Sequence, residues 1–215
     1  MKEGLASGDL PLSYGPDMRR FAGHWRAHFA EQMGRTPQGI ICEIGCHKGR
    51  TICEMAAAHP DLAFVGIDIT FKRVVTTANK AKHQGLDNVF SILVNGKALD
   101  RMFAPGELDG FIMFFPDPWT KKKRQRKNRL FNADFVNQLV PLLADDAFVW
   151  FKSDQEDYWR EADDLLASRG MRLVENPTGL LSETYETTFE KLFTQQDLPT
   201  FGSQRRISQP KPMIQ

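Results

Sequence analysis

Short apolar runs alternate with amphipathic stretches of helical period along most of this 215-residue chain. Such alternation is typical of crossover units in a parallel sheet, because each strand must be returned to the same edge by a helix. The apolar runs predict strands at about 40–44, 63–68, 89–94, 110–115, 147–152, 171–175 and 187–194. We therefore predict an α/β protein with a mostly parallel, seven-stranded sheet flanked by helices, in which the last strand is a candidate for antiparallel pairing.

Helical periodicity fills the intervals between these strands. It predicts helices at about 18–33, 49–59, 72–84, 131–143 and 155–169. Residues 1–16 are rich in Gly, Ser and Pro and predict a mobile arm, and residues 202–215 predict a flexible tail. We accordingly expect an arm and helix over 1–34, one domain over 35–201, and the tail.

Composition restricts the class of protein further. The chain is 41% hydrophobic and 26% charged, which suits a globular domain of this length. Its beginning lacks an apolar segment of the export type, and no run approaches the roughly 20 apolar residues that span a bilayer. We expect a cytoplasmic protein without membrane association; whether it is a monomer or a homodimer is left open.

The three cysteines argue against a metal site. Cys42, Cys46 and Cys53 are odd in number and lack a paired C-x-x-C pattern, which disfavours both a disulfide framework and a zinc site. Cys42 lies in a predicted strand and Cys53 in a predicted helix, where a thiol acts as a small apolar side chain. We predict no bound metal.

Positive charge is concentrated in one place. Seven of the nine residues from Lys121 to Arg129 are basic, although the whole chain carries only +1, so the other residues together carry −6. The basic segment directly follows the apolar run FIMFFPDPW, which delivers Asp117 to the end of a predicted strand. This position favours contact with a nucleic acid over a solvated loop or a localisation tract.

The first half of the chain carries signs of a nucleoside site. The strand ending at Glu43 and Ile44 runs into a turn at Gly45, where glycine lets the backbone approach a ligand. Asp68 closes the next strand 23 residues later, where an acid can accept both ribose hydroxyls. Asn95, after the third strand, suits an adenine edge, though an ordinary turn is almost as plausible.

A nicotinamide-dependent reductase is the competing interpretation of this half. The glycines of the turn stand four residues apart, at Gly45 and Gly49, and do not form the full G-x-G-x-x-G fingerprint. No Tyr-x-x-x-Lys pair follows the fourth strand. These two absences disfavour the reductase.

Several motifs, in order, resemble those of the bacterial tRNA (guanine-N7-)-methyltransferases between about residues 40 and 193. They are EIG with its glycine turn, GID, FPDPW, a basic loop ending in Arg-Leu, the pair Ser153-Asp154, and T-x-F-E at 187–190. The PDPW sequence followed by basic residues is the specific part. A glycine turn alone occurs in many other methyltransferases.

This resemblance implies a Rossmann-like class I methyltransferase fold, S-adenosyl-L-methionine as methyl donor, and N7 of the variable-loop guanine-46 of tRNA as acceptor. By matching position it implies a catalytic role for Asp117. It implies cofactor contacts at Glu43, Gly45, Asp68, Asn95 and Asp117, and substrate contacts at Lys121, Asp154, Thr187, Phe189 and Glu190.

The chain departs from the family pattern in three places. His47 stands where a glycine is typical, and Arg124-Gln125 where the family has Arg-His. Asn95 stands where an acid or amide is expected, a mild change that keeps hydrogen bonding. An RNA-binding relative without catalysis, and a methyltransferase with another acceptor, therefore remain open alternatives.

Overall fold

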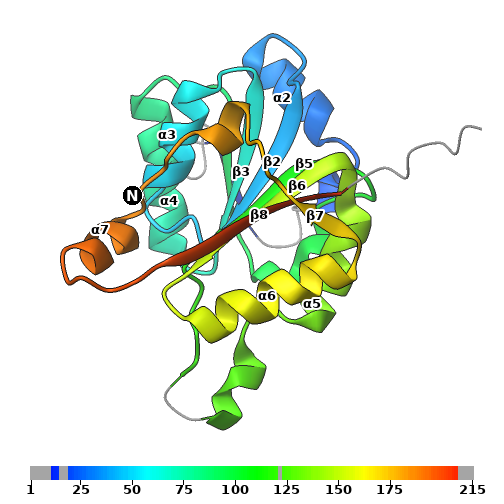
Figure 1. Cartoon of the computed structure of the whole chain (residues 1–215). Coiled ribbons are helices and arrows are strands. Elements are labelled where there is room, and N and C mark those ends of the chain that lie inside the picture. The colour runs from blue at the N-terminus through cyan, green and yellow to red at the C-terminus, as the bar shows by residue number, and fades with distance from the viewer. Residues whose placement is uncertain (1–10, 15–18, 121–122, 208–215) are drawn as a thin grey trace, which may run out of the picture.

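A twisted sheet lies between two layers of helices in the computed structural model, which describes residues 11–14, 19–120 and 123–207 (Figure 1). The sheet has eight strands in the order β1-β4-β3-β2-β5-β6-β8-β7. Pairing is parallel from β1 to β6, and β8 is antiparallel to both β6 and β7. The prediction of a mostly parallel α/β fold is confirmed, with one strand more than expected.

The central strands form because their apolar runs are covered on both faces. Their bounds are β2 Gly39–Ile44, β3 Leu62–Asp68, β4 Val89–Leu93, β5 Leu108–Phe114 and β6 Leu143–Ser153. Every residue of β2 is buried. Such continuous burial is expected for a parallel strand with helices on both sides.

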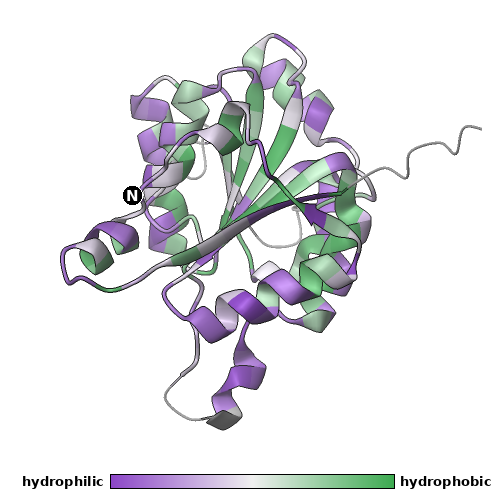
Figure 2. Cartoon of the chain, in the orientation of Figure 1, coloured by the Kyte–Doolittle hydropathy of each residue, from purple (hydrophilic) through white to green (hydrophobic). Residues whose placement is uncertain are grey.

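Two sets of helices cover the two faces. Apolar residues of α2 (Trp25–Met33), α5 (Ala133–Leu139) and α6 (Glu156–Ser168) join one core cluster. Residues of α3 (Arg50–Ala58) and α4 (Phe71–His83) join the other. The central strands are largely hydrophobic, and the helices carry many hydrophilic residues (Figure 2).

The predicted helices are confirmed, with differences at their ends. The helix expected at 18–33 begins at Trp25, because Gly23 has a φ of 78° and the chain turns there before α2 starts. The helix expected at 131–143 ends as α5 at Leu139 and continues as the 3-10 helix η4 (Val140–Leu142). Further 3-10 helices are η2 (Gly96–Arg101), η3 (Lys123–Asn128) and η5 (Gly179–Ser182).

Three expectations about the ends of the chain were wrong. Residues 187–194 are not a strand but the helix α7 (Thr188–Thr194), whose first turn is held by a capping box between Thr187 and Glu190. Residues 202–207 are not a tail but most of β8 (Phe201–Ile207), which separates β6 from β7 (Met171–Leu173). Residues 12–14 of the expected arm form β1 (Leu12–Tyr14) beside β4.

Among the described residues, no helix has the length and apolar character needed to cross a membrane.

Candidate active site

Five of the predicted site residues meet at one edge of the sheet. Strands β2, β3, β4, β5 and β6 run parallel, so their carboxyl ends share that edge. Glu43, Asp68, Asn95, Asp117 and Asp154 lie at or just beyond these ends. Strand order reverses at β2, with β3 and β4 to one side and β5 and β6 to the other. Ligands of open α/β sheets bind at such a switch point.

Glu43 is a buried acid with an unused oxygen. Its side chain is 5% exposed, and Oε2 has no hydrogen-bond partner among the described residues. Burial, and secondly the charge of Asp68, raise the pKa of Glu43 to about 8. A buried polar atom without a partner is uncommon, and this oxygen is available to a ligand.

The turn after β2 leaves space for such a partner. Gly45 has a φ of 81°, and a Cβ built on it would meet no atom within 4 Å. Its N–H donates to the carbonyl of Ile67 at 2.7 Å, which fixes the turn against β3. The positive φ favours glycine here, and any side chain at this position would project into the open space.

Asp68 is held at the end of β3 by backbone donors. It is 4% exposed and accepts from the N–H groups of Thr70 at 2.8 Å and His47 at 3.2 Å. Arg73 lies 3.6 Å from Oδ2. His47 adopts a φ of 51°, so the turn keeps a left-handed conformation at this position although no glycine stands there.

Asp117 lies in an exposed turn that directly follows β5. Its Oδ1 accepts from the N–H of Trp119 at 3.1 Å. Trp119 is 38% exposed, and it and Phe115 both have a φ near 50°. The turn thus presents a carboxylate and an indole ring to solvent.

Asn95 and Asp154 make local contacts. The Oδ1 of Asn95 accepts from the N–H of Lys97 at 3.0 Å and caps η2, and its side chain is exposed. The Oδ2 of Asp154 accepts from the side-chain amide of Gln155 at 2.8 Å. Both residues keep acceptor capacity for a ligand.

The α7 segment lies against the turn after β2. Phe189 is 43% exposed, and its ring centroid is 6.1 Å from that of His47 and 6.4 Å from that of Phe115. Glu190 uses one carboxylate oxygen for Lys152, at 2.7 Å, and the other for the N–H of Thr187. Thr187, Phe189 and Glu190 are therefore brought to the same edge, with Glu190 engaged in holding α7 in place.

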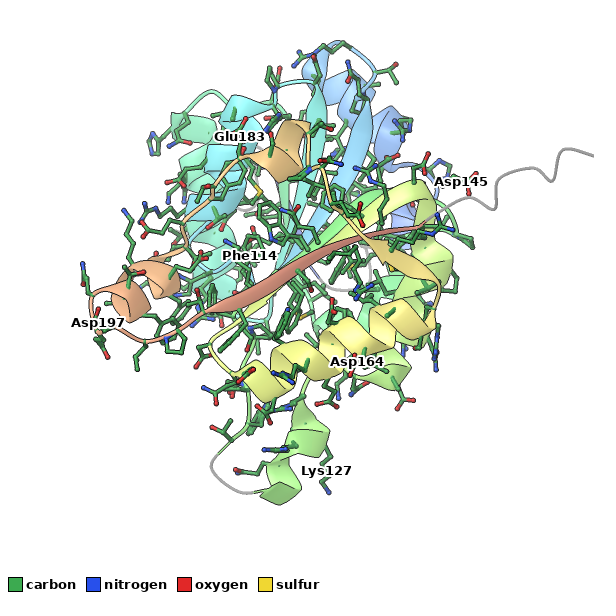
Figure 3. All side chains as sticks on the ribbon, in the orientation of Figure 1. Phe114, Lys127, Asp145, Asp164, Glu183 and Asp197 are labelled. Atoms are coloured by element: carbon green, nitrogen blue, oxygen red, sulfur yellow. The ribbon has the colours of Figure 1, made fainter. Side chains whose placement is uncertain are left out.

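The basic segment was expected to be exposed to a nucleic acid, but its last residue, Arg129, is buried. Lys121 lies outside the described residues. Lys127 lies on η3, which projects from the body of the molecule (Figure 3). Arg129, however, is 1% exposed and pairs with Asp157 and Glu161 of α6. The segment was expected to contact a nucleic acid, and Arg129 does not fit this expectation because its guanidinium lies inside the protein.

Sequence reasoning missed three residues at this site. In the sequence, Lys152 is only a lysine near the end of an apolar strand, and Phe115 is one aromatic residue among several. Neither has a pattern that marks it as part of the site. Arg129 is one of seven basic residues in its segment, and the sequence does not mark it as buried. Among the described residues, no group of three or more His, Cys, Asp or Glu side chains is placed to hold a metal ion.

Comparison with known proteins agrees with this geometry. A family model described as "Putative methyltransferase" matches residues 37–201. The structure is similar to a variant of the 16S rRNA (adenine(1408)-N(1))-methyltransferase from Catenulisporales acidiphilia with cosubstrate SAM. The TM-score is 0.57 at 16% identity, covering 88% of this chain and 94% of that one. It is also similar to a SAM-dependent methyltransferase from Aquifex aeolicus, with a TM-score of 0.52 at 13% identity, covering 90% and 94%.

The [4+2]-cyclase SpnF is similar too, with a TM-score of 0.56 at 11% identity, covering 86% of this chain and 81% of that one. Because a cyclase shares the fold, likeness at this level shows fold alone. Together with the family model, the fold defines a protein of the class I methyltransferase type.

Sequence relatives narrow the class. The chain is 32% identical over 183 residues to the tRNA (guanine-N(7)-)-methyltransferase of Geobacillus kaustophilus, covering 83% of this chain and 82% of the relative. It is 32% identical to that of Streptococcus mutans, covering 80% and 81%, and 34% identical to that of Lactococcus lactis subsp. cremoris, covering 71% and 68%. The chain belongs to the tRNA (guanine-N(7)-)-methyltransferase family.

Proposed function

We propose that this protein transfers the methyl group of S-adenosyl-L-methionine to N7 of a guanine in tRNA, at guanine-46 of the variable loop. Membership of the family supports the reaction. The structural observation that carries it is the unpartnered Oε2 of Glu43 beside the open turn at Gly45. This arrangement lies at the same sheet edge as the exposed turn of Asp117.

The residues at this edge fit the cofactor. A nucleoside brings ribose hydroxyls, and Glu43 and Asp68 are buried acids that can accept them. Gly45 leaves room for the cofactor to approach the backbone, and Asn95 offers an exposed amide. When bound, S-adenosyl-L-methionine supplies an electrophilic methyl group on a positively charged sulfur.

The acceptor atom demands little acid-base chemistry. N7 of guanine carries an in-plane lone pair and no proton, so methylation requires no general base. The ring gains positive charge as the methyl group is transferred. We assign to Asp117 the hydrogen bonds from the donor edge of the guanine and the offset of that charge, so that catalysis consists of positioning and electrostatic stabilisation.

RNA recognition is assigned to the surfaces around Asp117. Trp119 offers a face for an extracted base, an interaction worth about 1–3 kcal/mol in single-strand recognition. Lys121 and the exposed part of the basic segment are assigned to phosphate contacts, and Asp154, Thr187, Phe189 and Glu190 to the wall that holds the base. A tRNA substrate agrees with a cytoplasmic location, which we also propose.

The direct test is a transfer assay with purified protein, methyl-labelled S-adenosyl-L-methionine and unmodified tRNA. We expect label in tRNA and chain cleavage at a single 7-methylguanine. Calorimetry with S-adenosylhomocysteine separates the enzyme from a relative that only binds RNA. Cofactor binding without transfer to any tRNA of the source organism would rule out the proposed reaction.

A further inference from the structure

Arg129 is a buried residue of the basic segment, and its side chain contacts other parts of the protein instead of solvent. Its side chain is 1% exposed, and the guanidinium lies over the ring of Tyr158 at 4.4 Å. Nη1 donates to Glu161 at 2.8 Å and Nη2 to Asp157 at 3.0 Å, both on α6. A buried arginine of this kind persists because its charge and its donors are satisfied within the protein.

The third nitrogen of the Arg129 guanidinium, Nε, makes its hydrogen bond to a different element. Its Nε–H donates to the carbonyl of Pro118 at 3.1 Å. Pro118 stands between Asp117 and Trp119, the two exposed groups of the turn after β5. The guanidinium therefore links this turn to α6.

The turn needs such a link because it has few donors of its own. Pro116 and Pro118 have no N–H. In the turn, the N–H of Phe115 donates to the backbone carbonyl of Lys152 at 2.8 Å, and the N–H of Trp119 donates to the side chain of Asp117. Between them, the Pro118 carbonyl is held only by Arg129 among the described residues.

We propose that Arg129 is a positioning residue for methyl transfer: it fixes the turn that carries Asp117 and does not bind RNA. The proposal rests on the function assigned to Asp117 above. A rigid turn matters because a misplacement of about 1 Å in a group that orients the substrate can lower the rate about 100-fold.

Two substitutions of Arg129 separate this role from a general contribution to stability. Arg129→Gln ends in an amide nitrogen at the position of Nε, so it keeps the donor toward Pro118 and loses the contacts to Asp157 and Glu161. Arg129→Lys keeps a positive charge near those carboxylates but has a methylene group at the position of Nε. We expect Arg129→Lys to have the higher melting temperature of the two variants and the lower kcat.

The expected kinetic result is a loss of kcat of about 10- to 100-fold for Arg129→Lys, and of no more than about threefold for Arg129→Gln. The Kd for tRNA should change less than about twofold in both. Lys127→Gln, on the exposed segment, should show the opposite pattern, with a larger effect on tRNA binding than on kcat. If kcat follows melting temperature across the Arg129 variants, or if either variant weakens tRNA binding as Lys127→Gln does, the proposal is wrong.

Amide hydrogen exchange at Trp119 provides a readout that does not depend on activity. We expect faster exchange in Arg129→Lys than in Arg129→Gln or the wild type. Equal exchange in the two variants would overturn the positioning role even if the wild type methylates tRNA. A wild type that is inactive on tRNA, with exchange as expected, would remove the proposed reaction and leave Arg129 as the anchor of the turn.

Discussion

The two carboxyl groups on which the proposed function chiefly rests, Glu43 and Asp117, have opposite surroundings. Glu43 is buried beside Asp68 and its pKa is raised, whereas Asp117 is exposed and makes one described hydrogen bond, to the backbone of Trp119. The difference follows from position, since Glu43 lies within a strand covered on both faces and Asp117 lies beyond the end of one. We therefore predict an effect on activity for Asp117 and an effect on the pH dependence of stability for Glu43.

Asp117→Ala should remove activity without unfolding the protein. The carboxylate is assigned to stabilising charge on the guanine, and loss of such a group lowers kcat by about 100- to 1,000-fold. Asp145→Ala is the matched control, because Asp145 is equally exposed but lies near the amino end of β6, away from the site (Figure 3). Single-turnover methyl transfer and thermal melting check both variants. Near-normal transfer by Asp117→Ala would remove this residue from the reaction.

Glu43 should make the stability of the ligand-free protein depend on pH. Its pKa is about 8 in the folded protein and 4.5 as a reference value, so the folded state keeps a proton that the unfolded chain releases. The stabilisation that the protonated Glu43 gives to the folded state is largest below pH 4.5 and is lost as the pH rises through about 8. The slope is about 1.4 kcal/mol per pH unit between those limits. Urea unfolding at pH 5.5 and pH 8 should show a smaller decrease in unfolding free energy for Glu43→Gln than for the wild type, and equal decreases would contradict the buried acid.

At the scale of elements, the turn between β2 and α3 combines two glycines with different surroundings. Both have positive φ, 81° at Gly45 and 66° at Gly49. A Cβ at Gly45 would meet open space, whereas one at Gly49 would lie 2.9 Å from the Cα of Thr77 on α4. Gly45 thus leaves room for a ligand, and Gly49 allows the turn to pack against the neighbouring helix.

These surroundings predict different losses for two alanine substitutions. Gly45→Ala should cost about 1–2 kcal/mol of stability from backbone strain, and should weaken S-adenosylhomocysteine binding at least about tenfold by occupying the open space. Gly49→Ala should cost more stability, about 2–4 kcal/mol, because a steric clash with α4 is added to the same strain. Chemical unfolding and calorimetry measure the two quantities. A larger loss of stability in Gly45→Ala would contradict the open turn.

The sequence predicted the central elements well and the terminal ones poorly, for physical reasons. Strands β2 to β6 are buried on both faces, so their apolar runs are unambiguous. The segment 187–194 contains Thr and Phe, which favour strands, but its helix is set by a capping box that needs the geometry of Thr187 and Glu190. Strand β8 is rich in polar residues and so lacks an apolar run, and its Arg205 pairs with Asp163 on α6, a contact that no local pattern reveals.

The residues of the candidate site also fall into those that the sequence predicts and those that it does not. Glu43, Asp68 and Asp117 follow directly from the rule that parallel strands end at one edge, and the structure brings them there. The burial of Arg129 and the ion pair of Lys152 with Glu190 depend on packing between distant segments. Such pairings cannot be read from one sequence, because nothing local distinguishes a buried arginine from an exposed one.

At the scale of the whole molecule, positive charge is concentrated in one segment. The chain carries a net charge of only +1, yet the segment from Lys121 to Arg129 is strongly basic. Lys127 is exposed on η3, whereas Arg129 is neutralised inside the protein. Not every charge of the segment is therefore available to RNA.

This distribution predicts the salt dependence of tRNA binding. The logarithm of the association constant should fall linearly with the logarithm of salt concentration, because phosphate contacts release counterions. Lys127→Gln should reduce the slope by about one, and Arg129→Gln should leave it unchanged. Filter binding at several salt concentrations measures the slopes. An equal reduction by both variants would contradict the burial of Arg129.

The identity of the acceptor atom is tested most directly with two tRNA transcripts that differ in one ring position. One carries guanine at position 46 of the variable loop, and the other carries 7-deazaguanine there, which has carbon in place of N7. We predict methylation of the first transcript and none of the second, with 7-methylguanine as the product seen by nucleoside mass spectrometry. Methylation of both transcripts to the same extent would show that the methyl group goes elsewhere and would contradict transfer to N7.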